Sequence, residues 1–164
     1  MLRLLGLFDR PADIGCLAAL RCAPAITELT EPLVDLGEAD WHLTLSSLAD
    51  SDLVSMQSEP PMGSRPVALD AHPLIREYFA TQLRNRNPEA WKSAHLRLYE
   101  HLKHSVDYQP DTLDGLQPLY QAVAHGCLAG RHDEACNEVY WIRILRGNQY
   151  YSSQVLGALG TDLS

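Results

Sequence analysis

The stretch Leu69–Phe79 constrains the fold more than any other, because it passes from a short extended run directly into an amphipathic helix. Pro73 suits the first turn of that helix, where its missing N–H has no helical partner to lose. The spacing predicts a helix over 73–86, with apolar and polar side chains on opposite faces. The apolar face holds Leu74, Ile75, Tyr78, Phe79 and Leu83, and the polar face Arg76, Glu77, Gln82 and Arg84.

The residues before this helix alternate between helical patterns and two short extended runs. Apolar spacing predicts helices over 2–8, 12–22 and 38–50, with a short helix and loop within 27–37. Extended runs at 53–56 and 67–69 flank a loop rich in Pro, Gly and Ser. Helices followed by a β-hairpin are the plan of a winged helix, so we expect a winged-helix domain over residues 1–72.

The residues after Pro73 are predicted to be helical throughout. A connecting pair of helices, 73–86 and 88–105, occupies residues 73–110. Apolar stripes then predict two helices, one ending at Gly130 and one over 132–146, joined by four residues into an antiparallel hairpin. This hairpin has the length of one tetratricopeptide-like repeat of about 34 residues, which needs neighbours to bury its faces. We therefore expect residues 111–164 to begin such an array, and the chain to be part of a longer protein.

Charge and composition limit which cellular compartment and which classes of partner are expected. The formal net charge of the 164 residues is −8, and residues 1–70 hold eleven Asp/Glu against four Lys/Arg. The basic excess of residues 71–105 suits acidic protein segments better than nucleic acid. No apolar run reaches the roughly 18 residues of a membrane helix. Four cysteines without a C-x-x-C pair, and no secretory signal, predict a cytosolic protein with free thiols.

The motifs of catalysis and nucleotide binding do not occur in the sequence. There is no phosphate-binding G-x-x-x-x-G-K-[ST], no G-x-G-x-x-G and no G-x-S-x-G. Asp50, Asp52 and Asp70 could place carboxylates together near the hairpin, but capping and turn formation already explain them. We therefore expect no enzyme activity from this chain alone.

Histidines and cysteines could also form a metal site in the second half. His125, Cys127, His132 and Cys136 are close in sequence, and the last two are one helical turn apart. Zinc sites favour tighter paired spacing, so buried thiols and helix-packing histidines are the favoured interpretation, with no metal expected. The pair His101 and His104 is explained by a solvated helix face.

A winged helix commonly binds DNA through its third helix. Here that helix would be 38–50, which contains Glu38, Asp40 and Asp50 and neither Lys nor Arg. Side chains that approach phosphates are normally basic, so nucleic acid is not the expected partner. A winged-helix DNA-binding transcription regulator and a free-standing helical protein–protein adaptor remain alternative functions.

Three segments together resemble a known family. They are Asp70–Phe79, Ser93–Leu102, and Pro118–Cys127 followed by Ala129-Gly130-Arg131. The stretch Arg143–Gly147 adds to them. This pattern resembles the winged helix and first tetratricopeptide-like repeats of bacterial signal-transduction ATPases with numerous domains (STAND), the NB-ARC/NACHT-type NTPases. The resemblance spans nearly the whole chain and is strongest over residues 69–102 and 116–147.

The resemblance implies a role for His72. In that family a histidine of a Met-His-Asp-like motif reaches the β-phosphate of ADP and helps to hold the resting state. His72 occupies the matching place, with Ala71 where the family has Met and Pro73 where it has Asp. A histidine at a helix start could instead bond to nearby backbone, and the sequence leaves both interpretations open.

The resemblance also implies a mechanism and partners. An upstream domain would bind ADP or ATP, and the winged helix would latch that domain closed. The helical repeats would sense a protein ligand or effector and release the latch, allowing oligomerisation. The chain would then be a cytoplasmic regulatory and interaction segment without a cofactor of its own.

Overall fold

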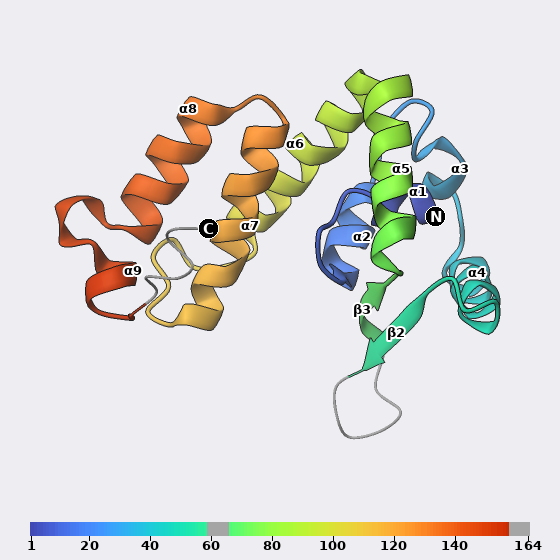
Figure 1. Cartoon of the computed structure of the whole chain (residues 1–164), viewed down its shortest axis with the longest axis horizontal. Coiled ribbons are helices and arrows are strands. Elements are labelled where there is room, and N and C mark those ends of the chain that lie inside the picture. The colour runs from blue at the N-terminus through green and yellow to red at the C-terminus, as the bar shows by residue number, and fades with distance from the viewer. Residues whose placement is uncertain (59–65, 158–164) are drawn as a thin grey trace. The chain divides into compact units, whose positions relative to one another are not determined.

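A computed structural model of the chain describes residues 1–58 and 66–157 (Figure 1). It is mainly helical with a small three-stranded antiparallel sheet, which confirms the predicted mainly helical class with a β-hairpin. The chain forms two compact units, residues 1–94 and residues 95 onward. No helix in the described part of the chain is both long and apolar enough for a membrane crossing.

The first unit contains the sheet and most of the short helices. Its elements are α1 (Leu2–Leu5), β1 (Ala12–Asp13), α2 (Ile14–Arg21), α3 (Glu31–Val34), α4 (Glu38–Asp50), β2 (Ser55–Ser58), β3 (Pro66–Asp70) and α5 (Pro73–Arg86), followed by the start of α6 (Pro88–His104). The helices predicted over 38–50 and 73–86 have these bounds in the structure. Residues 59–65, within the predicted hairpin loop, lie outside the described residues.

The sheet has the order β1-β3-β2, so β3 is its central strand. Leu69 pairs with Ala12 on one side and with Met56 on the other. The strand β1 was not predicted, because residues 12 and 13 were placed at the start of a helix. In the structure Asp13 caps α2 instead, accepting hydrogen bonds from the backbone N–H groups of Gly15 at 2.7 Å and Cys16 at 3.2 Å.

An aliphatic core holds the first unit together. Its largest fully buried side chains are Leu4, Leu5, Leu17, Leu20, Leu45 and Leu69. α1 packs tightly on α5, since a Cβ on Gly6 would lie 2.6 Å from the backbone nitrogen of Ala80. Only glycine allows the two backbones to come this close. Within α5 this packing buries Leu83, whereas Pro73 and Leu74 in the first turn are exposed.

The regular secondary structure described in the second unit is all helical. After the rest of α6 come α7 (Leu113–Leu128), α8 (His132–Glu134), the π-helix η1 (Ala135–Ile144), the 3₁₀-helix η2 (Gly147–Gln149) and α9 (Tyr151–Gln154). α7 and η1 lie side by side as an antiparallel pair (Figure 1). Their shared core contains Leu116, Leu119, Val139 and Ile144.

The helix predicted over 132–146 is present but not as a uniform α-helix. Its first turn is α8, and the remainder is the π-helix η1. In a π-helix each N–H donates to the carbonyl five residues earlier. At the end of η1, Leu145 N–H donates in this way to the Tyr140 carbonyl at 2.9 Å. Apolar spacing does not distinguish the two windings over a few turns. Residues 158–164, the end of the predicted repeat region, lie outside the described residues.

Candidate functional site

His72 is the residue that the sequence singled out, and the structure places it at the N-cap of α5. Its Nδ1 accepts a hydrogen bond from the backbone N–H of Leu74 at 3.3 Å, and the side chain is exposed. This hydrogen bond to the backbone is the one expected if His72 serves to start the helix. It does not exclude a ligand, because the ring also remains open to solvent at the positive end of a 14-residue helix.

A carboxylate lies close to His72 in the sequence. Asp70 forms an ion pair with Nη1 of Arg76 at 3.1 Å and accepts a hydrogen bond from the backbone N–H of Ala71 at 2.8 Å. Arg76 therefore offsets a negative charge that would otherwise oppose an anion at the helix start. Asp50 and Asp52, the other carboxylates considered, are exposed at the end of α4.

The four possible metal ligands of the second half do not form a cluster. Among residues 1–58 and 66–157, no group of three or more His, Cys, Asp or Glu side chains could hold an ion. His125 is buried and pairs with His95, with 2.8 Å between their Nδ1 atoms and the rings stacked. Burial, with a smaller effect from His125, lowers the pKa of His95 to about 3.

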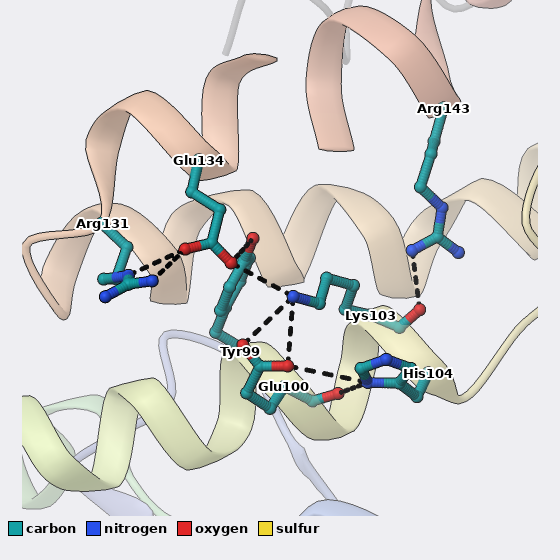
Figure 2. Close-up of polar contacts among 7 residues, drawn as sticks. All are labelled: Tyr99, Glu100, Lys103, His104, Arg131, Glu134 and Arg143. Atoms are coloured by element: carbon teal, nitrogen blue, oxygen red, sulfur yellow. Dashed lines mark hydrogen bonds and ion pairs between the residues drawn. The ribbon is translucent and has the colours of Figure 1, made fainter. Parts of the chain in front are cut away.

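A network of polar side chains joins α6 to α8 (Figure 2). Lys103 lies at its centre and contacts Glu100 on its own helix at 3.1 Å and Glu134 at 3.2 Å. Tyr99 donates to the same oxygen of Glu134 at 3.2 Å, and Arg131 pairs with the other oxygen. Lys103 also lies 4.5 Å from the centre of the Tyr99 ring. Glu134 thus accepts hydrogen bonds from three different side chains.

These contacts determine the protonation states of the network. The hydrogen bond from Arg131 is the main reason that the pKa of Glu134 is lowered. Burial raises the pKa of Tyr99 to about 12. Burial alone would lower the pKa of Lys103, but hydrogen bonds to Glu100 and Glu134 raise it overall. Tyr99 stays protonated and Lys103 charged at neutral pH, which suits a structural junction better than proton transfer.

Two arginines attach the segment before α7 to the end of η1. Arg143 is buried and donates to three backbone carbonyls, those of Lys103 at 2.7 Å, Tyr108 at 2.7 Å and Asp107 at 3.1 Å. Arg146 donates to the Pro110 carbonyl at 2.8 Å and to Asp111 at 2.9 Å. Sequence patterns did not indicate these roles, since a helical arginine is normally placed on the solvent face.

A groove of about 400 Å³ lies beside these contacts. It is lined by Lys103, His104, Val106, Tyr108, Glu138, Val139, Ile142 and Arg143. Tyr108 is 64% exposed and Ile142 is 42% exposed, while Val139 is buried. Lys103 and Arg143 at its edge are already engaged by the network and by backbone carbonyls. The groove therefore offers mainly apolar contact, which favours a protein segment over a charged small molecule.

Comparison of the chain with protein-family models, with curated proteins and with solved structures gave no match.

Proposed function

We propose that this chain is a regulatory segment of a STAND-type signal-transduction NTPase. Its first unit acts as a winged-helix latch on an upstream nucleotide-binding domain, and its second unit begins a tetratricopeptide-like sensor for a protein partner. The observation that carries the proposal is the junction between β3 and α5, with His72 exposed at the start of the helix.

The order of elements in the first unit supports the latch. Helices α2, α3 and α4 precede the antiparallel hairpin of β2 and β3, and β3 runs into α5 after two residues. The hairpin and β1 form one sheet, so the strand that leads to His72 is held on both edges. A histidine positioned this way is suited to contact a bound ligand with little loss of side-chain freedom.

The hydrogen bonding of His72 defines which atom would meet the nucleotide. Because Nδ1 accepts from Leu74 N–H, the proton of the neutral ring resides on Nε2. Nε2 is then the donor toward the β-phosphate of ADP bound in the upstream domain. The nucleotide belongs to that domain, and His72 contributes one donor at a helix N-terminus.

The second unit supports the sensor role. α7 and η1 form one antiparallel helical hairpin, and the groove beside η1 presents an apolar surface that a protein segment could cover. Binding there releases the latch if the partner prefers the open arrangement of the parent protein.

The first test is the reading frame around this segment. A G-x-x-x-x-G-K-[ST] motif within roughly 300 residues upstream is expected. In the parent protein, His72→Asn should then shorten ADP retention, because Asn keeps the helix cap but lacks the ring donor. His42→Asn, on the exposed face of α4, is the matched control and should leave retention unchanged. A frame without a nucleotide-binding motif, or equal retention in both variants, contradicts the proposal.

A free-standing helical adaptor is the second candidate, favoured by the same groove. It predicts partner binding without any upstream nucleotide-binding domain, so substitution of Ile142 by Glu should abolish partner capture while His72→Asn has no effect. The DNA-binding alternative has less support, since α4 carries exposed Glu38, Asp40 and Asp50. Duplex DNA should remain unbound even at low salt, where phosphate contacts are strongest.

A further inference from the structure

Two cysteines face each other across the α7–η1 hairpin. Cys127 is next to the last residue of α7, and Cys136 is the second residue of η1. The helices are unusually close here, since a Cβ on Gly126 would lie 2.8 Å from the Cβ of Ala135. Gly126 and Ala135 directly precede the two cysteines in sequence. The missing side chain at Gly126 therefore brings two thiols from different helices together.

The two thiols are neighbours that differ in burial. Cys127 is partly buried, and Cys136 beside it is exposed. Burial raises the pKa of the Cys127 thiol, and the neighbouring Cys136 raises it further. Cys136 is thus the sulfur that a soluble reagent reaches first, with Cys127 held beside it as a second thiol.

The other two cysteines lie in the first unit and lack this arrangement. Cys16 is buried in α2, and burial raises the pKa of its thiol to about 12. Cys22 is exposed at the end of α2 and donates to the Ala18 carbonyl at 3.3 Å. Cys22 therefore serves as an internal control for an exposed thiol elsewhere in the chain.

We propose that Cys127 and Cys136 form a two-thiol modification site, at which peroxide installs a reversible disulfide between α7 and η1. This proposal does not depend on the proposed function, because the thiol chemistry requires neither a nucleotide nor a protein partner. In a reducing compartment both thiols rest in the reduced form, so the crosslink would report a transient oxidant.

The reaction proceeds in two balanced steps. The Cys136 thiolate attacks one oxygen of hydrogen peroxide, forming the sulfenic acid and releasing hydroxide. The sulfur of Cys127 then attacks the sulfur of the sulfenic acid, and its proton leaves with the hydroxyl group as water. The two sulfurs together lose two electrons, and the peroxide is reduced. A dithiol reductant reverses the step through thiol–disulfide exchange.

The crosslink would close a short ring around the turn between α7 and α8. It ties the two helices of the hairpin together where Arg131 N–H already bonds to the Gly126 carbonyl at 2.8 Å. Opening of the hairpin should slow after oxidation, and backbone amides of α7 and η1 should exchange with solvent more slowly.

The experiment uses the full chain, treated with a small excess of hydrogen peroxide under native conditions. The wild type should lose two free thiols and the mass of two hydrogen atoms, and peptide mapping should join residue 127 to residue 136. Cys22→Ser should behave in the same way. Cys136→Ser and Cys127→Ser should each abolish the intramolecular crosslink. Dithiothreitol should restore both thiols in the wild type.

Phenylarsine oxide provides a second measurement that needs no oxidation, because trivalent arsenic bridges two adjacent thiols. The reduced wild type and Cys22→Ser should each bind one equivalent, and both single variants of the pair should bind none. Circular dichroism of the Ser variants checks that the helices persist. Oxidation of Cys136 to sulfinic acid without a crosslink, crosslinks through Cys22, or no arsenical binding would overturn the proposal.

Discussion

The interiors of the two units are built from different chemistry. In the first unit the interior is apolar and mostly aliphatic, and Thr30 is the buried polar side chain among its described residues. In the second unit, His95, His125, Arg143 and Ser152 are buried beside Leu and Val. The first unit keeps most of its ion pairs at the surface, whereas Arg143 and the Lys103–Glu134 pair lie largely inside the second.

This difference implies that the stabilities of the two units depend differently on pH and salt. Apolar burial has no preferred direction and is insensitive to pH and salt. Buried polar groups stabilise a fold only while every partner is present, and they respond to protonation and ionic strength. The second unit should therefore be the more responsive part, which agrees with the sensor role proposed for it.

The largest effect is expected at Arg143. Replacing it by Met keeps an apolar chain of similar reach but leaves three carbonyls without their donor, and should cost the second unit about 4 kcal/mol. Hydrogen exchange of η1 amides measures this loss. Arg84→Met, on the exposed side of α5, should change stability by less than about 0.5 kcal/mol. A similarly small loss for Arg143→Met would mean that the polar interior does not hold the second unit.

The aliphatic interior is tested at Leu17, which is fully buried in α2. Leu17→Ala should destabilise the first unit by about 3 kcal/mol, from lost burial and the cavity left behind. Urea unfolding followed at neutral and mildly acidic pH, and at low and high salt, should give the same loss throughout. Leu43→Ala, at a side chain 68% exposed, should be nearly neutral. A loss at Leu17 that varied strongly with pH would break the comparison.

Acid should weaken the second unit more than the first. Unfolded His95 takes up a proton near its ordinary pKa of 6.5, whereas the folded residue does so only near about 3. The unfolded chain therefore binds more protons between these values, and stability falls as pH decreases from 6.5 toward 3, by at most about 1.4 kcal/mol per unit.

The variant His95→Asn isolates this contribution, because Asn can still donate to His125 but does not titrate. The free energy of unfolding of the second unit should then change less steeply with pH, and the difference in slope is the contribution of His95. Glu134, whose pKa is lowered mainly by Arg131, acts in the same direction and remains in both proteins. An unchanged slope in His95→Asn would show that the histidine pair does not account for acid sensitivity.

The smallest effect is expected at the carboxylate that joins α8 to α6. Glu134→Gln retains some hydrogen bonding but loses its charge, and should cost about 1 kcal/mol at low salt and less at high salt. Thermal unfolding at two salt concentrations measures both values. Glu89→Gln, which removes an exposed pair with Lys92, is the control and should have almost no effect.

Local patterns predicted the long helices well and the tertiary contacts poorly. The bounds of α4 and α5 follow from apolar spacing and from the proline at position 73. The strand β1 was missed because two residues carry no period, and their pairing with β3 depends on the rest of the unit. The site prediction identified His72 and its two alternatives, and the structure adds the contact with Leu74.

The sequence by itself determined the mainly helical class, the hairpin and the helix start at Pro73, because helix periodicity and proline chemistry act within a few residues. Helix packing decides that His95 meets His125, that Arg143 turns inward, and that Cys127 and Cys136 are neighbours. His95 and His125 lie 30 residues apart, and Arg143 lies 35 from Tyr108. Such contacts depend on the angle and spacing at which helices pack, and no local pattern encodes either quantity.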